Sequence, residues 1–325
     1  DDVTKQCIES LIQCFGTLQM EIIVVDNASD NGSYEKLLQC YGNASYIHFL
    51  HNRKNLGYAA GNNVGFQYAK KVLKADWICL ANNDVIFQDK KWIDKVRGLY
   101  QNTPYYVLGP DIVTPQGQHQ NPFREHVASN ASVLKNWLHD IVVYLALKLK
   151  LQQKINQDVK PQKELQKETW KQADLDFHGV LHGSCLLFSP DYVKSFDGLY
   201  GGTFLYCEEE ILCYILEKVG YRYVYCSDVQ VLHNHSTSFK RSVQNEIERK
   251  KIIVKNRIQS YYKFLKITRY QGVFERERGI ILERTVGVCG RRTRVKKFKS
   301  AIFPDGIFDY HGFCYATVFW HTYRL

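Results

Sequence analysis

The chain has 325 residues, of which 45% are hydrophobic and 14% aromatic, and its formal net charge is +10. This length and apolar content exclude a disordered protein and predict one large globular domain, or one domain with an appendage. The positive charge favours anionic partners such as phospholipid, nucleic acid or the phosphates of a nucleotide-sugar.

The ten cysteines contain no Cys-x-x-Cys pair, and several lie inside apolar runs, as small hydrophobic residues do. They predict a reducing compartment, with neither a zinc site nor a disulfide framework. No signal peptide opens the sequence, and no uncharged apolar run reaches the roughly 18 residues of a membrane-spanning helix. We therefore expect a cytoplasmic protein that does not cross a membrane.

The first part of the chain alternates between helix-like and strand-like segments. Apolar residues recur at helical spacing from Cys7 to Phe15. A β-branched run then ends at Asp26 and Asn27, which predicts a buried strand with a polar end. A short helix is expected at 33–41 and a strand at 46–50, so this region predicts units of an α/β sheet.

A loop rich in Asn and Gly follows at 52–63, and a helix is expected from residue 61 to 73. Glycines at this point allow close approach of the backbone to a ligand or to another element. Asn62 lies at the start of the predicted helix, where it could simply cap the helix. The loop therefore has two interpretations, ligand binding and helix packing.

The segment 76–84 is the centre of the pattern. An apolar run from Trp77 to Ala81 predicts a buried strand, and it stops at Asn82, Asn83 and Asp84. Asn and Asp at a strand end can merely form a turn. Two buried strands that each end in a carboxylate, however, predict a polar crevice along one edge of the sheet.

Further along, a helix is expected at 92–100 and strands at 105–112, 185–188 and 223–231. Between 137 and 154, leucines and aromatic residues interleave with lysines. This segment is too charged to span a bilayer, but it suits an amphipathic helix on a membrane surface. A helix packed on the domain explains it equally well.

Three consecutive glutamates, Glu208, Glu209 and Glu210, open a predicted helix at 208–218. Carboxylates in a first turn are favoured by the helix dipole by up to about 1 kcal/mol each, which could explain any one of them. Consecutive helical positions differ by about 100°, so the three cannot all face one cleft. At most one or two of them are expected to serve chemistry.

Five segments of the chain form a pattern in a fixed order. They are Val25–Ser29, Asn55–Gly65, Leu80–Asp84, His182–Ser184 and Phe204–Glu210. In order and spacing they resemble the family 2 glycosyltransferases of GT-A fold, especially the bacterial rhamnosyltransferase-like and capsule-type members. The resemblance covers about residues 1 to 265.

The resemblance implies a Rossmann-like mixed α/β sheet flanked by helices, with a basic helical appendage at the C-terminus. The GT-A domain would span 1–265, with a nucleotide-binding half at 1–125, a helical insertion at 126–175 and an acceptor half at 176–265. Residues 266–325 would be a basic, aromatic extension. In the family a strand precedes the first helix, and none precedes Asp1 here. Either the chain is cut short or the sheet is built without that strand.

The implied reaction is inverting, metal-dependent transfer of a sugar from dTDP-rhamnose or a UDP-sugar to a glycan or polyprenyl-linked acceptor in cell-surface polysaccharide synthesis. Glu209 is the expected base, with Glu208 second. Asp84 and His233 would hold Mg²⁺ or Mn²⁺. By the same resemblance Asp26 would bind the nucleobase of the donor and Asn82 its ribose. The residues expected to face the nucleotide-sugar are Asp26, Asn27, Asn55, Gly57, Asn62, Asn82, Asn83 and Gly183.

Two other classes stay open. A catalytically inactive, truncated relative would bind a sugar-nucleotide or a partner only. A nucleic-acid-binding protein would fit the charge, but no helix-turn-helix, zinc-finger or RNP pattern is present, so we expect no nucleic acid partner. Basic residues interleaved with apolar ones at 137–154 and 276–299 predict peripheral contact with an anionic membrane at the inner face of the cell membrane.

Overall fold

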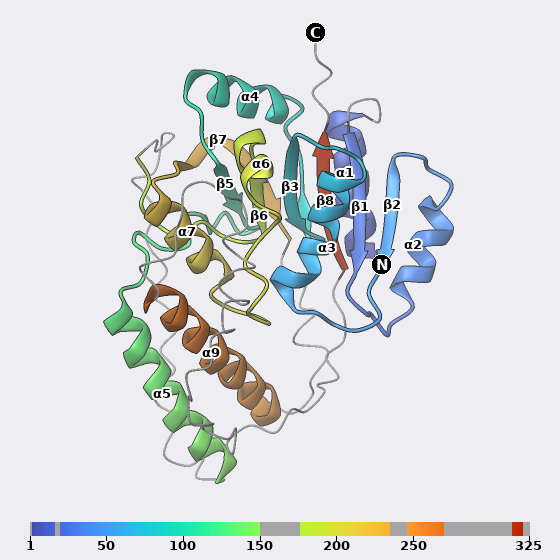
Figure 1. Ribbon diagram of the computed structural model, residues 1–325. Coiled ribbons are helices and arrows are strands. Elements are labelled where there is room, and N and C mark those ends of the chain that lie inside the picture. Colours follow the sequence, from blue (N-terminus) through green and yellow to red (C-terminus); the bar gives the residue numbers. More distant parts are fainter. Residues whose placement is uncertain (1, 17–19, 150–175, 235–245, 270–313, 321–325) are drawn as a thin grey trace, which may run out of the picture.

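The computed structural model describes residues 2–16, 20–149, 176–234 and 246–269, together with the backbone of 314–320. Within this part of the chain, one mixed sheet of eight strands has the order β2-β1-β8-β3-β6-β5-β7-β4 (Figure 1). The expected class, a mixed α/β sheet flanked by helices, is confirmed. The strands are β1 Met20–Asp26, β2 Ile47–His51, β3 Trp77–Asn82, β4 Val85–Ile86, β5 Val107–Val113, β6 Cys185–Phe188, β7 Tyr223–His233 and β8 Cys314–Trp320.

β8, the last strand in the sequence, lies inside the sheet between β1 and β3. β1 runs parallel to β2, and β8 lies antiparallel between β1 and β3. β1 and β3 are therefore parallel to each other, so their polar carboxyl ends lie at the same edge. β8 takes the central position where the family resemblance expects a strand ahead of the first helix.

Successive side chains of a strand point to opposite faces of the sheet, and here both faces are apolar. Helices therefore cover both faces. In β1, Ile23 and Val25 join one core cluster while Ile22 and Val24 join the other. The helices beside the first cluster are α3 Tyr58–Lys71, α6 Pro190–Ser195 and α7 Glu208–Val219. Those beside the second are α1 Asp2–Phe15, α2 Ser33–Tyr41 and α4 Trp92–Asn102.

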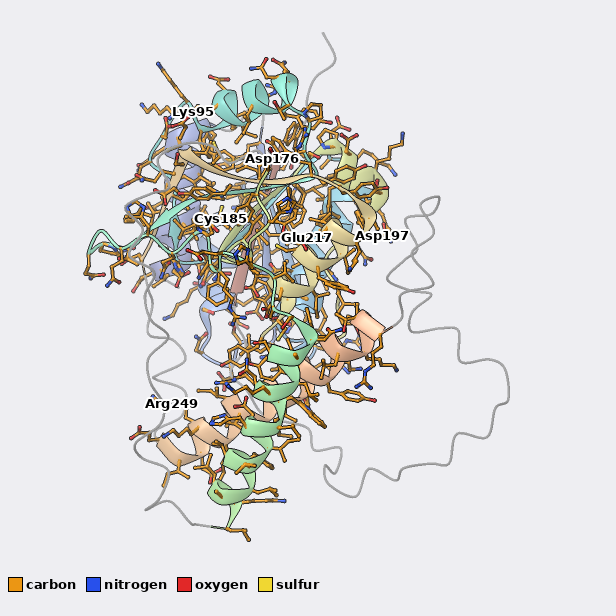
Figure 2. All side chains as sticks on the ribbon, turned by 90° about the vertical axis from the view of Figure 1, so that its left-hand side faces the viewer. Lys95, Asp176, Cys185, Asp197, Glu217 and Arg249 are labelled. Carbon is orange, nitrogen blue, oxygen red and sulfur yellow. The ribbon has the colours of Figure 1, made fainter. Side chains whose placement is uncertain are left out.

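Two further helices, α5 Asn130–Lys148 and α9 Glu246–Arg269, pack against each other and extend away from the sheet (Figures 1 and 2). α5 begins seven residues before the predicted 137–154 segment, because Ser129 caps it by accepting a hydrogen bond from Ser132 N. α9 continues through the expected boundary at 265, and β8 belongs to the main sheet. Residues 150–154 and 276–299 lie outside the described residues.

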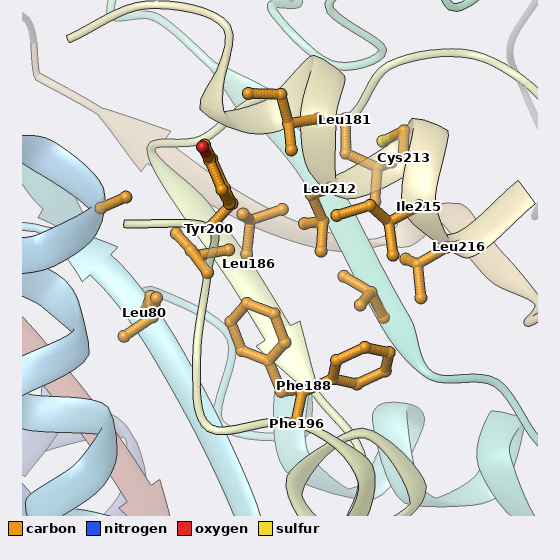
Figure 3. Close-up of a cluster of buried hydrophobic side chains, with 14 of the residues drawn as sticks. Leu80, Leu181, Leu186, Phe188, Phe196, Tyr200, Leu212, Cys213, Ile215 and Leu216 are labelled. Carbon is orange, nitrogen blue, oxygen red and sulfur yellow. The ribbon is translucent and has the colours of Figure 1, made fainter. Parts of the chain in front are cut away.

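No helix in the described ranges is long and apolar enough to span a bilayer. The apolar core beneath α7 belongs to the first of the two clusters. Leu80, Leu186 and Phe188 of β3 and β6 pack there against one face of α7 (Figure 3). Figure 3 shows that face contributing Leu212, Cys213, Ile215 and Leu216. This packing fixes the start of α7 relative to the ends of the central strands.

The start of α3 meets the segment before α7 through backbone contact. Gly57 has φ +83°, and a Cβ atom there would collide with the backbone of Phe204. Tyr58 N donates a hydrogen bond of 2.8 Å to Phe204 O. Glycine is required at residue 57 by its conformation and by the lack of space. The contact ties the first half of the chain to the loop that precedes Glu208.

We predict that Gly57→Ala destabilises the protein by at least about 2 kcal/mol, since it adds left-handed strain and a backbone collision. Gly98→Ala is the matched control: Gly98 lies within α4, and nothing is within 4 Å of its Cβ position. That substitution should raise the free energy of unfolding by about 0.5–1 kcal/mol, the usual gain from Gly to Ala in a helix. Urea denaturation measures both, and equal effects would contradict the packing role.

Candidate active site

The polar ends of β1 and β3 meet the start of α7 and the end of β7 at one edge of the sheet. β3 ends at Asn82, and Asn83 and Asp84 form the turn into β4. β4 pairs with β7 so that Val85 lies opposite His233. This pairing brings Asp84 and His233 together although 149 positions separate them.

Asp84 and His233 are both buried, and Asp84 Oδ1 lies 3.1 Å from His233 Nε2. On the other side of the ring, His233 Nδ1 lies 2.7 Å from Gln120 Oε1. An amide oxygen only accepts hydrogen bonds, so Nδ1 carries the hydrogen. In a neutral ring, the Nε2 lone pair then points at the Asp84 carboxylate.

A carboxylate oxygen and an imidazole nitrogen at this distance can share a hydrogen bond or hold a metal ion together. A carboxylate oxygen and an imidazole nitrogen are ligands that Mn²⁺ accepts, and Mg²⁺ favours the carboxylate. Among the described residues, no group of three or more His, Cys, Asp or Glu side chains is placed to hold a metal. The pair therefore fits a metal that takes most of its ligands from substrate phosphates and water.

The three glutamates at the start of α7 have three different environments, as the 100° rotation between helical positions requires. Glu210 is buried and forms an ion pair of 2.5 Å with Arg124. Glu208 is also buried, and its Oε1 has no hydrogen-bond partner among the described residues. Glu209 is half-buried and lies against Gly183. The first turn of α7 is therefore not an exposed helix end, where carboxylates without a chemical role would be stabilised by water and the helix dipole.

Burial determines the ionisation of these carboxyl groups. It raises the pKa of Glu208 to about 8, and the charge of Glu209 adds to the shift. Burial also raises the pKa of Glu209, with Glu210 adding to the shift and Arg124 opposing it. A carboxylate with a raised pKa is a stronger base, as general base catalysis requires. Glu208 is largely protonated at neutral pH, which leaves Glu209 as the better base.

Gly183 lies directly beside Glu209. A Cβ atom at Gly183 would collide with Glu209 Oε1, so glycine makes room for the carboxylate. The carbonyl oxygen of Gly183 accepts a short hydrogen bond from Tyr58 OH. Because Tyr58 also starts α3, the glycine-rich loop, Gly183 and Glu209 form one connected unit.

Asp26 and Asn27 hold the loops at the end of β1. Asp26 is fully buried, accepts a hydrogen bond from Ser29 N and pairs with His51 Nδ1 at 2.8 Å. The Asn27 side chain donates to Asn55 Oδ1 and Gly57 O, and it accepts from Leu56 N and Asn52 Nδ2. Asn27 therefore anchors the 52–57 loop on the strand end.

The remaining predicted ligand-binding residues also have partners inside the protein. α3 begins at Tyr58 with Gly57 at its N-cap, so Asn62 lies in the second turn and does not cap the helix; its Nδ2 donates to Tyr58 O one turn earlier. Asn83 Nδ2 donates to Thr4 Oγ1 of α1 at 2.9 Å. Asn82 N donates to Ser184 O, next to Gly183. The structure brings the predicted residues to one edge of the sheet, and direct contact of these side chains with a donor stays a prediction.

Four contributors to this site were missed by the sequence analysis. Gln120 and Arg124 come from the segment after β5, which carries no motif. His51 lies at the end of a short strand and gives no signal by itself. Tyr58 lies within the segment Asn55–Gly65, but only its contact with Gly183 reveals its part in the site.

The sequence model of Glycosyl transferase family 2 matches residues 1–163, half of the chain. The chain belongs to glycosyl transferase family 2. The matched residues include Asp26 and Asp84, and Glu209 and His233 lie beyond them. This match confirms the predicted glycosyltransferase family.

A curated relative is the low-salt glycan biosynthesis hexosyltransferase Agl10 of Haloferax volcanii. It is 26% identical over 244 residues, which are 74% of this chain and 68% of Agl10. Among solved structures, GalNAc-T7 with UDP, GalNAc and Mn²⁺ gives a TM-score of 0.49 at 12% identity. The match covers 74% of this chain and 45% of that one. TarS 1–349 of S. aureus gives 0.43 at 12% identity, covering 88% and 75%.

The buried carboxyl of Glu208 predicts a pH dependence of stability. Its pKa rises from 4.5 to about 8 on folding, so between these pH values the folded state holds a proton that the unfolded chain releases. The free energy of unfolding should therefore fall as pH rises through this window, by up to about 1.4 kcal/mol per pH unit. Glu208→Gln should remove this slope.

Urea denaturation between pH 5 and pH 9 measures the effect. Glu248→Gln, on an exposed side chain of α9, is the control and should keep the wild-type slope. Parallel curves for wild type and Glu208→Gln would contradict the buried protonated carboxyl.

Proposed function

We propose that the chain transfers a hexosyl or rhamnosyl group from a nucleotide-sugar, dTDP-rhamnose or a UDP-sugar, to a glycan or lipid-linked acceptor in cell-surface polysaccharide synthesis. Family membership supports glycosyl transfer, and the description of Agl10 as a glycan biosynthesis hexosyltransferase supports the acceptor class. The observation that carries the proposal is one sheet edge with the buried Asp84–His233 pair and the raised-pKa carboxyl of Glu209.

Glycosyl transfer needs the charge on the diphosphate leaving group to be neutralised. In our proposal Asp84 and His233 hold Mg²⁺ or Mn²⁺ at the end of β3. The ion supplies electrostatic stabilisation of the leaving diphosphate. Gln120 holds the His233 ring so that Nε2 faces Asp84, as partners behind metal-ligating histidines commonly do.

The acceptor hydroxyl must also lose its proton as it attacks. Glu209 is the proposed base, and the space beside Gly183 leaves its carboxylate free of a colliding side chain. Arg124 keeps Glu210 engaged in an ion pair, so only Glu209 combines partial exposure with a raised pKa. Direct attack by the activated hydroxyl is a single displacement, so the anomeric configuration should invert.

At the end of β1, we propose that Asp26 binds the nucleobase and Asn82 the ribose. Asp26 is paired with His51, whose side chain is 45% exposed. A bound nucleobase could therefore replace His51 beside the Asp26 carboxylate, and the carboxylate would keep a partner. We also propose that Asn27, Asn55, Gly57, Asn62, Asn83 and Gly183 face the nucleotide-sugar. We further propose that the protein works at the inner face of the cell membrane.

The metal assignment predicts the behaviour of Asp84→Asn. Wild-type protein should bind a UDP- or dTDP-sugar at least tenfold more tightly with Mn²⁺ than with EDTA, because an ion held by Asp84 would offset the charge of the diphosphate. Asp84→Asn should lose this enhancement. Asp76→Asn is the matched control, since Asp76 is exposed at the opposite end of the same strand. Isothermal titration measures the donor affinity of both variants with Mn²⁺ and with EDTA. An undiminished Mn²⁺ enhancement in Asp84→Asn would contradict the assignment of Asp84 as a metal ligand.

The base assignment predicts that the glutamates separate on mutation. Glu209→Gln should lower turnover about a hundredfold or more, the scale of general base catalysis, with donor affinity unchanged. Glu210→Gln should chiefly lower thermal stability, because it leaves the Arg124 guanidinium without its carboxylate partner. Turnover and thermal unfolding of the two variants test this. Equal, mild losses of turnover would mean that the base lies elsewhere.

A further inference from the structure

The helices α5 and α9 form a two-helix arm, here defined as residues 130–148 and 246–269. Their packed faces are fixed by Asp140, which is buried and pairs with Arg257 at 2.8 Å and 3.0 Å. Figure 2 shows the arm extending away from the sheet, with Arg249 on its outer part. Ser260 Oγ donates to Leu205 O at 2.8 Å, three residues before Glu208, so the arm is bonded directly to the segment that precedes α7.

The outer face of α5 carries an apolar stripe. Its members recur at spacings of four, four, three and four residues, so they lie on one helix face. They are exposed to 38%, 52%, 65%, 45% and 69%, namely Leu134, Leu138, Val142, Leu145 and Leu149. A continuous exposed row of large apolar side chains on a soluble surface marks an interaction site.

The same arm concentrates the positive charge of the molecule. It contains ten basic and three acidic residues, which give seven net positive charges of the ten on the whole chain. One of the three acids, Asp140, is buried against Arg257. Lys148 and Lys255 lie close enough for repulsion to lower the pKa of Lys255, after the larger effect of burial. An excess of this kind attracts anionic partners.

A groove connects the apolar stripe with these charges. It has a volume of 490 Å³ and is lined by Leu134, Trp137, Tyr262, Leu265, Lys266 and Arg269. Leu134 belongs to the stripe as well, so the groove is continuous with it. Apolar walls with two cations and no acidic residue in the lining complement an acyl or prenyl chain with an anionic head.

From these observations we infer that the α5–α9 arm is a docking surface for an anionic lipid bilayer. The apolar stripe enters the boundary between headgroups and acyl chains, to a depth of about 5–10 Å, and the basic residues face the headgroups. This inference deepens the proposed function and rests on it only for the identity of the acceptor. It brings the loop that precedes Glu208 next to the surface where a lipid-linked acceptor would lie.

Flotation with vesicles of phosphatidylglycerol or phosphatidylcholine tests the docking surface. The wild-type chain should float with phosphatidylglycerol at low salt and detach as NaCl rises, because screening shortens the Debye length to about 10 Å at 0.1 M. Val142→Glu with Leu145→Glu should lower the partition at least tenfold. The matched control is Val72→Glu with Leu38→Glu, whose side chains are 58% and 43% exposed on other elements, and it should float like wild type.

Lys266→Gln with Arg269→Gln tests the charge and should weaken flotation on phosphatidylglycerol without affecting folding, which circular dichroism checks. Absence of wild-type flotation at low salt, or equal flotation of the stripe variant and its control, would overturn the inference. So would a stripe variant that turns a dimer into a monomer while wild type ignores vesicles, since a second copy would then cover the stripe. Donor binding by the same variants in solution separates failure of docking from failure of the proposed function.

Discussion

The site depends on the backbone contact between Gly57 and Phe204. One residue comes from the loop after β2 and the other from the loop before α7, so this contact joins the two halves of the chain. The lack of a side chain at Gly57 lets the Tyr58 amide reach the Phe204 carbonyl, and Tyr58 then bonds to Gly183 beside Glu209. A side chain at residue 57 would move α3 away from the glutamates and open the site.

Burial, and not the helix dipole, decides the chemistry of the three glutamates. A first-turn carboxylate gains at most about 1 kcal/mol from the dipole, which favours ionisation. The shift of the Glu208 pKa from 4.5 to about 8 has the opposite sign and corresponds to several kcal/mol at about 1.4 per pH unit. Arg124 offsets part of the same penalty at Glu210. Burial also raises the pKa of Glu209, which suits a proton acceptor.

The apolar cores of the strands could be predicted from sequence because burial on both faces leaves a continuous hydrophobic run. β1 ends at Asp26 and β3 at Asn82, where a polar side chain follows the apolar run, and the helix at 33–41 and the strand at 185–188 have the predicted bounds. α3 begins at Tyr58, before the predicted residue 61, because its first amide bonds to Phe204, far away in sequence.

Within the site, the types of residue were predictable but their partners were not. Asp84, His233 and Glu209 follow strand ends or open a helix, which local pattern reveals. Gln120 and Arg124 matter only through what they contact, and no local pattern encodes a contact across the fold. The central place of β8 escaped prediction for the same reason, since pairing between distant strands is set by the completed sheet.

The Asp140–Arg257 pair sets the rotation of α5 about its own axis. Successive residues turn by about 100°, so Leu138, Val142 and Leu149 lie on the side of the helix opposite Asp140. Holding Asp140 inward therefore holds the stripe outward. Losing either charge alone leaves the other buried without a partner, which is costly, whereas exchanging both for apolar residues can be tolerated. Related proteins should therefore either keep both Asp140 and Arg257 or replace both of them.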